Sequence, residues 1–191
     1  MRPAGGLTVR AFVALPCPPG LRQVLGRQLA EWRAIDAPIA WVDPASAHLT
    51  LRFLGSADIV RLGGLQNRLG EVAASARPIH ARPGATGAFP GWQRPRVLWL
   101  AVESGGAIER LAEAVENAAR EAGLDPEGRP FTAHLTLGRV RGQCGAGRAV
   151  RAVRGWAPAG PAEPIPEMIL FRSELHSAGA RHIPLARYPM A

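Results

Sequence analysis

The tetrapeptide His-Leu-Thr-Leu occurs twice in this chain, at residues 48–51 and 134–137. The copies begin 86 residues apart, close to half of the 191-residue length. Each copy starts a short apolar run that predicts a β-strand, in which alternate side chains share one face. His48 and Thr50 therefore point one way and the leucines the other, and His134 and Thr136 repeat this arrangement. Such a repeat predicts a duplicated fold that presents two imidazoles and two hydroxyls at one site.

Chance does not account for the repeat. The chain holds five threonines among its 191 residues. Two of its five histidines would each be followed two places later by threonine with a probability of about 1%, before the leucines are considered. Two histidines in one site supply the acid and the base that reactions of a phosphodiester need, because the unperturbed pKa of imidazole lies near neutrality.

The rest of the sequence predicts strands and helices in an order that occurs twice. Apolar, β-rich runs predict strands at 7–16, 41–42, 48–54, 79–89, 96–102, 131–140, 167–175 and 182–188. Apolar residues at helical spacing predict helices after Pro19, after Ser56 or Asp58, and after Ser104. Residues 142–162 are rich in Gly, Ala, Arg and Pro, so they form either a loop or one short helix around 149–156. No glycine-rich phosphate loop follows a strand, which argues against a parallel doubly wound sheet. The order predicts an α+β fold made of two similar lobes.

Composition indicates which kind of binding partner and which cellular compartment to expect. The formal charge is +8 and all 23 basic residues are arginine, which favours a polyanionic partner such as nucleic acid. Codon bias in a GC-rich genome explains arginine in place of lysine, but not the shortage of acids. Cys17 and Cys144 are isolated, so neither a disulfide framework nor a zinc site is expected. No apolar run approaches membrane-spanning length, and Arg10 interrupts the apolar stretch at 7–15, which argues against a signal peptide there. We expect a cytoplasmic protein.

With these residues in view, the chain resembles the 2H phosphoesterase superfamily, specifically the RNA 2′,3′-cyclic phosphodiesterases, also called 2′–5′ RNA ligases. The resemblance covers nearly the whole chain in the right order. It is carried by RAFVALP at 10–16, HLTLRFLG at 48–55, GAFP at 87–90, RPRVLWL at 94–100, RPFTAHLTLGR at 129–139, LFRSEL at 170–175 and GARHIPL at 179–185. The clearest departure is the glycine-rich segment 142–162, where relatives often have a better helix.

The resemblance implies one domain over residues 1–191, built of two intertwined lobes with one motif strand in each, at 48–51 and 134–137. Antiparallel sheets are expected to face each other across a central cleft, with helices on the outside and a pseudo-twofold relation between the lobes. The implied reaction is hydrolysis of an RNA 2′,3′-cyclic phosphate to a 2′-phosphomonoester, with no metal or other cofactor. We expect a monomer that needs no protein partner and does not bind a membrane.

The resemblance also orders the two histidines, which the symmetric sequence alone leaves unordered. It implies that His134 is the proton acceptor and His48 the proton donor to the departing 3′ oxygen. Thr50 and Thr136, on the same faces, have hydroxyls suited to hydrogen-bonding the non-bridging phosphate oxygens. A bell-shaped pH–rate profile is expected, because one imidazole must be neutral while the other is protonated.

Three further residues are candidates for substrate binding. Arg139 matches an arginine that the family places beside the phosphate. Simple alternation puts it on the opposite face from His134, so a bulge or strand end is required; a surface ion pair is the alternative. Arg52 has the parity of His48, although a solvated position would fit equally well. Phe12 matches an aromatic residue of the family's first strand and could stack a terminal base or simply belong to the core.

The other histidines, arginines and tryptophans have more ordinary interpretations. His80, His176 and His182 are expected at the surface or at strand edges, and the five tryptophans are expected mainly to pack. The arginines at 148, 151 and 154 follow helical spacing, which favours a solvated helix face; contacts with RNA phosphates are the alternative.

The motifs leave several functions open. Ligation of a cyclic phosphate end to a 5′-hydroxyl end needs the same acid and base as hydrolysis. A small cyclic phosphate is another possible substrate. A non-catalytic module that binds RNA ends would not need two proton-transfer groups, so the intact motifs argue against it.

Overall fold

The computed structural model describes residues 7–176 and 179–191. Its elements, in chain order, are β1 (Thr8–Pro16), α1 (Pro19–Arg33), β2 (Ile39–Trp41), a 3-10 turn (Pro44–Ser46), β3 (His48–Asp58), α2 (Ile59–Ser75), β4 (Ile79–Phe89), β5 (Val97–Glu103), α3 (Ala107–Glu121), β6 (His134–Val140), α4 (Gly147–Arg154), β7 (Glu163–Ile165), β8 (Glu167–His176) and β9 (Gly179–Pro189).

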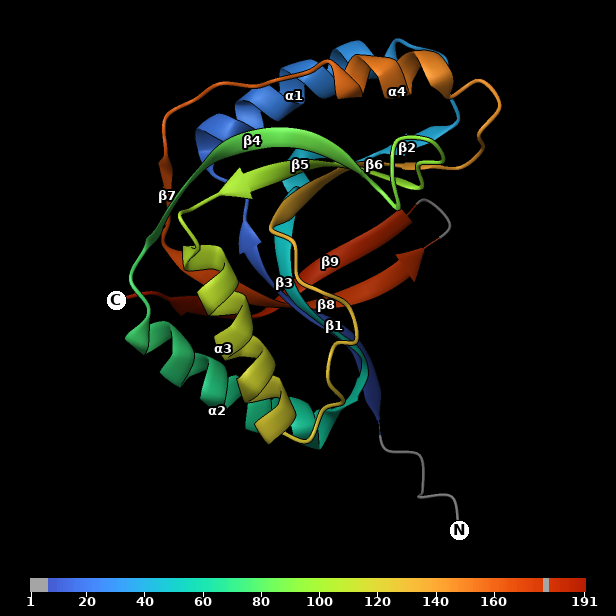
Figure 1. The fold of residues 1–191 in the computed structure, drawn as a ribbon. Helices are drawn as coiled ribbons and strands as arrows, with labels where there is room; N and C mark the ends of the chain where they lie inside the picture. The colour runs from blue at the N-terminus through green and yellow to red at the C-terminus, as the bar shows by residue number, and fades with distance from the viewer. Residues whose placement is uncertain (1–6, 177–178) are drawn as a thin grey trace.

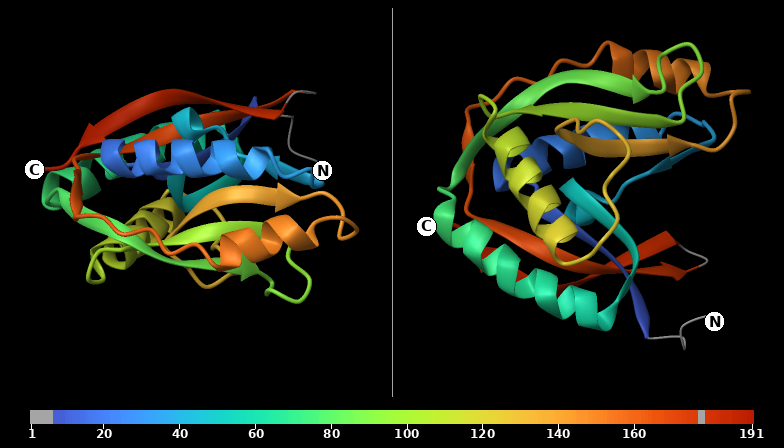
Figure 2. Two further views of the ribbon diagram at one scale, coloured as in Figure 1. Left: turned by 90° about the horizontal axis from the view of Figure 1, so that it is seen from above. Right: turned by 60° about the horizontal axis from the view of Figure 1, so that its bottom comes forward.

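The described strands form one antiparallel sheet in the order β7-β4-β5-β6-β3-β1-β8-β9, with β2 paired to β6. The two motif strands, β3 and β6, lie side by side in its middle. Only one pair of residues joins them in register, Leu49 opposite Leu135. These are the equivalent leucines of the two motifs, so the pseudo-twofold axis that relates the repeats lies at this pair. From there the two halves of the sheet diverge (Figures 1 and 2).

The helices pack in two pairs on the outside of the sheet (Figure 1). One pair is α1 and α4; the ring of Trp32 in α1 meets that of Trp156, two residues beyond the end of α4, edge to face with centroids 5.1 Å apart. The other pair is α2 and α3. The last two strands, β8 and β9, return to the half of the sheet that β1 and β3 began, so each half of the sheet contains segments that are far apart in the sequence.

The leucines of both motifs anchor the strands in the core. Leu49 and Leu135 are each 1% exposed, and Leu51 and Leu137 are also buried. The histidines and threonines that alternate with them are half-buried. The alternation inferred from the sequence therefore holds over the four motif residues, because each strand has one face on the core.

The predicted α+β class, with antiparallel strands and external helices, is confirmed, and the two halves are joined as one sheet. The helix expected within 142–162 is α4, two residues earlier than its predicted start. Strand β7 was missed, since it is three residues long and contains a proline. Asp58 is the cap of α2, accepting a hydrogen bond from the backbone N–H of Val60 at 2.8 Å. Ser104 lies ahead of α3, and its hydroxyl accepts from the N–H of Ile108 at 2.9 Å.

Candidate active site

The two motif histidines are held in the same way by the backbone just before each strand. The Nδ1 atom of His48 lies 2.8 Å from the carbonyl oxygen of Ser46. The Nδ1 atom of His134 lies 2.7 Å from the carbonyl oxygen of Thr132. A carbonyl oxygen only accepts, so Nδ1 carries the hydrogen in both rings. Each neutral imidazole therefore keeps its Nε2 lone pair for a ligand, and protonation of that atom would make it a donor.

The motif threonines lie two residues further along each strand. Thr50 and Thr136 are half-buried, like the histidines. Neither hydroxyl has a hydrogen-bond partner in the part of the chain that the structure describes. Both hydroxyls are therefore available to donate to a bound oxygen.

His48 lies in a group of aromatic rings from three strands. Its ring stacks on Phe12 of β1, with centroids 4.9 Å apart. Phe12 in turn stacks on Phe171 of β8 at 5.2 Å. His182 of β9 meets the edge of the group, 5.1 Å from His48 and 4.9 Å from Phe12. Phe12 is 3% exposed, so in this conformation it supports the His48 ring more than it offers a free stacking surface.

His182 was expected at the surface or a strand edge; it lies half-buried in β9, the last strand of the sheet order, and its ring contacts His48. Its Nδ1 is buried and has no hydrogen-bond partner among the described residues. The contact with His48 was not predicted, because the sequence shows no spacing that links residue 182 to residue 48; the pairings of β9 with β8, β8 with β1 and β1 with β3 bring them together. His80 is exposed, as expected. The side chain of His176 lies outside the described residues.

His134 has its own aromatic neighbours. Phe89 of β4 meets its ring edge to face at 5.2 Å, and Trp99 of β5 lies 6.0 Å away. The Trp99 ring lies directly over Gly87, where a Cβ atom would come within 2.1 Å of it. Glycine at position 87 therefore leaves the space that the indole occupies. Trp32, Trp41 and Trp156 form a packing cluster instead, as expected for most of the tryptophans.

Both motif strands contain a β-bulge at the same point of the repeat. In β3 the register against β1 shifts between Thr50 and Arg52, which leaves Leu51 as the extra residue. In β6 the register against β5 shifts between Thr136 and Gly138, which leaves Leu137 as the extra residue. A bulge reverses which face the following side chains occupy.

These bulges decide where the two candidate arginines point. Arg139 comes after the bulge in β6 and is exposed, and the described residues provide it with no ion-pair partner. The bulge that its proposed position required is present. Its charge acts on both motif histidines, so Arg139 lies close to both. The equivalent residue of the first repeat is Phe53, which is 48% exposed and lies 6.1 Å from Phe12.

The expectation that Arg52 shares the face of His48 is wrong, because the bulge at Leu51 turns it toward the core. Arg52 is 6% exposed and forms ion pairs with Glu116 and with Glu127, the second at 3.6 Å. Its guanidinium also donates to the carbonyl oxygens of Phe53 and Asp125. Arg52 thus ties β3 to α3 and to the loop that leads to β6.

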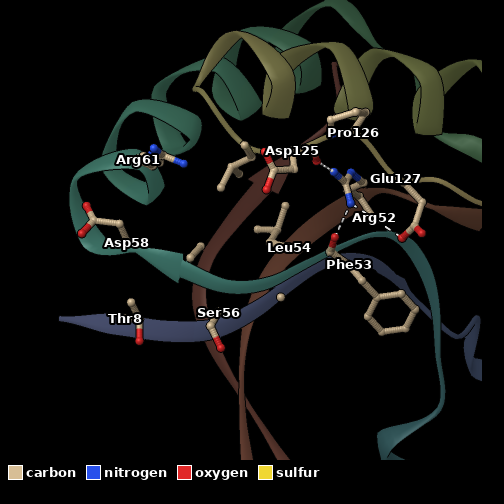
Figure 3. A pocket seen from close by; sticks show the side chains of 13 residues that line it. Thr8, Arg52, Phe53, Leu54, Ser56, Asp58, Arg61, Asp125, Pro126 and Glu127 are labelled. Atoms are coloured by element: carbon tan, nitrogen blue, oxygen red, sulfur yellow. Dashed lines mark hydrogen bonds and ion pairs between the residues drawn. The ribbon is translucent and has the colours of Figure 1, made fainter. Parts of the chain in front are cut away.

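A cavity of about 340 Å³ lies beside this ion-pair cluster (Figure 3). Its lining includes Asp58, Asp125 and Glu127 together with Arg52 and Arg61. In Figure 3 the Phe53 ring points to the opposite side of β3 from Arg52. The cavity is therefore bordered by the same stretch of β3 that follows the motif, but the groups on its Arg52 side are already paired with one another.

The surroundings of the histidines favour their neutral forms. Burial lowers the pKa of His48 to about 4, and the charges of His182, Arg139 and His134 act in the same direction, while the hydrogen bond to Ser46 opposes them. Burial also lowers the pKa of His134, with Arg139 adding to the effect and the hydrogen bond to Thr132 opposing it. Both rings are thus held in the neutral form near neutral pH, and an anion bound between them would favour protonation of one ring.

Within residues 7–176 and 179–191, no group of three or more His, Cys, Asp or Glu side chains is placed to hold a metal ion. None of the helices in these ranges has the length and apolar character needed to span a bilayer.

Comparison with solved structures places this architecture among known proteins. A structure from Thermus thermophilus, TT0787, superposes with a TM-score of 0.80 at 27% identity, covering 95% of this chain and 97% of that one. The LigT protein of E. coli, solved with 3′-AMP, superposes with a TM-score of 0.75 at 26% identity and covers 96% of this chain and 99% of its own. The fold, with its two motif strands, is that of a 2H phosphoesterase.

Sequence comparison gives the family. The model of the 2′-5′ RNA ligase superfamily matches residues 21–179, and the chain belongs to that family. A relative from Bacillus subtilis (strain 168), named RNA 2′,3′-cyclic phosphodiesterase, is 34% identical over 128 residues, which are 67% of this chain and 69% of the relative. One from Thermus thermophilus with the same name is 30% identical over 199 residues, covering 95% and 90%. The chain is thus a member of a family of phosphodiesterases.

Proposed function

We propose that this protein hydrolyses the 2′,3′-cyclic phosphate at the end of an RNA to a 2′-phosphomonoester, without a metal ion. The observation that carries the proposal is the matched pair of histidines, each with Nδ1 on a carbonyl oxygen and Nε2 free. The names of the relatives, RNA 2′,3′-cyclic phosphodiesterase, support the same reaction.

In the proposed reaction His134 is the base and His48 the acid. Nε2 of His134 takes a proton from a water molecule as the water oxygen bonds to phosphorus. The bond between phosphorus and the 3′ oxygen breaks, and Nε2 of protonated His48 gives its proton to that oxygen. The products are a 2′-phosphate and a free 3′-hydroxyl. Both proton transfers are provided by imidazoles, so the reaction as written needs no metal-bound water.

The charge that develops on the phosphate is stabilised by donors on both strands. Thr50 and Thr136 donate their hydroxyl hydrogens to the non-bridging oxygens, and Arg139 supplies the nearby positive charge. The same phosphate anion raises the pKa of His48 from its low value in the free protein, because a bound negative charge favours the protonated ring. Substrate binding therefore favours the protonated form of His48 that acts as the acid.

The direct test is to incubate the purified protein, in the presence of EDTA, with a short RNA that ends in a 2′,3′-cyclic phosphate. A 2′-phosphate product is expected. A 3′-phosphate product would contradict the proposed order of acid and base. Absence of any conversion would refute the hydrolase, and joining to an added RNA with a 5′-hydroxyl end would indicate ligation instead.

Histidine variants make the test specific. His48→Ala and His134→Ala should each lower kcat by about 10²-fold or more, the usual contribution of a positioned acid or base. His80→Ala is the matched control, since His80 is exposed on β4 and lies opposite Pro164 of β7, at the far edge of the sheet from the motif strands. Full turnover by both motif variants would refute the mechanism.

A further inference from the structure

One end of the sheet carries seven exposed arginines. Two stretches of sequence meet there, 72–102 and 128–162, and neither contains Asp or Glu. We call this surface the arginine face; its members are Arg94, Arg96, Arg139, Arg141, Arg148, Arg151 and Arg154, all exposed. None of the seven forms an ion pair with any residue that the structure describes.

Contacts hold the parts of this face together. The turn between β4 and β5 packs on the segment that joins β6 to α4: the side-chain amide of Gln143 donates to the carbonyl oxygen of Pro95 at 2.8 Å. The N–H of Val140 donates to the carbonyl oxygen of Arg96 at 3.0 Å. From α4, the guanidinium of Arg154 lies over the Trp92 ring, 5.9 Å from its centroid. Figure 1 shows the turn, the end of β6 and α4 gathered at the upper right.

Arginines elsewhere in the described structure are often paired with carboxylates. Arg68 pairs with Glu121, Arg82 with Glu103 at 2.9 Å, and Arg187 with Glu167 at 2.6 Å. The seven members of the arginine face have no such pair among the described residues, and the two stretches that form it contain no carboxylate that could neutralise them. Crowded like charges repel one another unless an anion neutralises them.

The arginine face extends around the end of the sheet, from α4 on the leucine side to Arg139 on the histidine side, at the candidate active site. Arg139 belongs to it and lies close enough to both motif histidines for its charge to lower the pKa of each ring. A chain of anionic groups that begins at the histidine pair would find, in this direction, a succession of guanidinium groups that are unpaired within the described residues. On the opposite side, the residue equivalent to Arg139 is Phe53, next to a cavity whose lining combines Asp58, Asp125 and Glu127 with Arg52 and Arg61.

We propose that the arginine face binds the phosphates of the RNA strand on the 5′ side of the cyclic end, so that the strand leaves the site past the β4–β5 turn and α4. This inference rests on the proposed function. It assigns the direction of the bound strand and makes an RNA chain a better substrate than a mononucleotide. Arginines suit this role because they neutralise phosphates and release the condensed counterions.

The test compares a nucleoside 2′,3′-cyclic phosphate with a single-stranded RNA of about ten nucleotides that ends in the same group. For the wild type, kcat/KM should be higher for the RNA, and only the RNA value should fall steeply with salt. Replacing Arg148, Arg151 and Arg154 together by Gln should lower the ratio of RNA to mononucleotide kcat/KM about tenfold or more. It should also reduce the slope of log(kcat/KM) against log salt by about 2, since each single-strand phosphate contact contributes about 0.7.

The control variant replaces Arg77, Arg110 and Arg120 together by Gln, which removes the same amount of charge. These three arginines are exposed and lie in or beside α2 and α3. The control variant should keep the wild-type ratio and slope. Equal losses in both triple variants would overturn the proposal in favour of a general effect of net charge, and an unchanged ratio in the α4 variant would overturn it outright. If the wild type converted neither substrate, the proposed function itself would fail. Conversion of both with equal kcat/KM would refute only the arginine face.

Discussion

Arg52 offers a sharp test of how this fold is held together, because the bulge in β3 takes it away from the substrate side. Replacing Arg52 by Met keeps the length and the apolar stem but removes the guanidinium. Glu116 and Glu127 then lose their partner, and the carbonyl oxygens of Phe53 and Asp125 lose a charged donor. We expect Arg52→Met to destabilise the protein strongly and to leave turnover by the folded protein nearly unchanged.

The size of the effect follows from burial. Removing one partner of a buried ion pair typically costs about 3–5 kcal/mol, because the remaining charge is left without compensation. The side chains of Glu116 and Glu127 are 25% and 27% exposed, so water restores part of their hydration and the lower end applies, about 3 kcal/mol. For a chain of this size each kcal/mol lowers Tm by about 2–4 °C, which gives a decrease of about 6–12 °C.

The assay pairs thermal or urea unfolding with steady-state kinetics at a temperature where the variant is folded. Arg52→Lys is the matched variant, since it keeps the charge but loses the fork of donors, and it should fall between wild type and Met. The reasoning would be refuted if Arg52→Met kept the wild-type Tm but lost 10²-fold or more in kcat/KM, the loss typical of an anion-stabilising donor. That result would make Arg52 a substrate-binding residue after all.

Three further outcomes are expected. The pKa of His48 is lowered to about 4 in the folded protein, so the unfolded chain binds more protons than the folded one between pH 4 and about pH 6.5. The contribution of His48 to the free energy of unfolding should therefore be complete above about pH 6.5 and decrease toward pH 4. His48→Gln should flatten this dependence in urea titrations. His182→Gln should raise the pKa of His48 and move the alkaline limb of the kcat/KM profile to higher pH, because His48 acts in its protonated form, whereas an unmoved limb would show that His182 does not act on His48. Gly87→Ala places a methyl group within 2.1 Å of the Trp99 ring, so it should cost about 1–3 kcal/mol in unfolding and lower kcat, while Gly91→Ala, with nothing within 4 Å, should do neither.

Strict periodicity explains which parts of the site were predictable. His48, Thr50 and their counterparts precede the bulges, so alternation gives their faces correctly. Arg52 comes one residue after the bulge, and alternation then gives the wrong face. A β-bulge has no reliable signature in a single sequence when the inserted residue is a leucine, because leucine suits the core on either side of the irregularity. The bulge in β6 could be inferred only because the family resemblance requires Arg139 to face the phosphate.

Long-range contacts were the other limit. Phe171 and His182 reach His48 through successive strand pairings, β3 with β1, β1 with β8 and, for His182, β8 with β9. The sequence predicted those strands but not their place in the sheet, since β8 and β9 follow the second repeat and yet complete the first half. The helices were easier, because their apolar stripes and caps are local. Asp58 and the leucines of α2 needed no knowledge of the rest of the chain.

The repeated bulge also explains how a symmetric pair of histidines can perform two different tasks. Five residues after each histidine, the chain places Phe53 in one half and Arg139 in the other, both exposed. The imidazoles, their carbonyl partners and the threonines are equivalent, so these residues and the aromatic neighbours are what distinguish the two sides. His48 packs among Phe12, Phe171 and His182, whereas His134 has Phe89 and Trp99. A duplicated strand thus supplies the two proton-transfer groups, and the residues outside the repeated tetrapeptide give each group its own environment and therefore its own pKa.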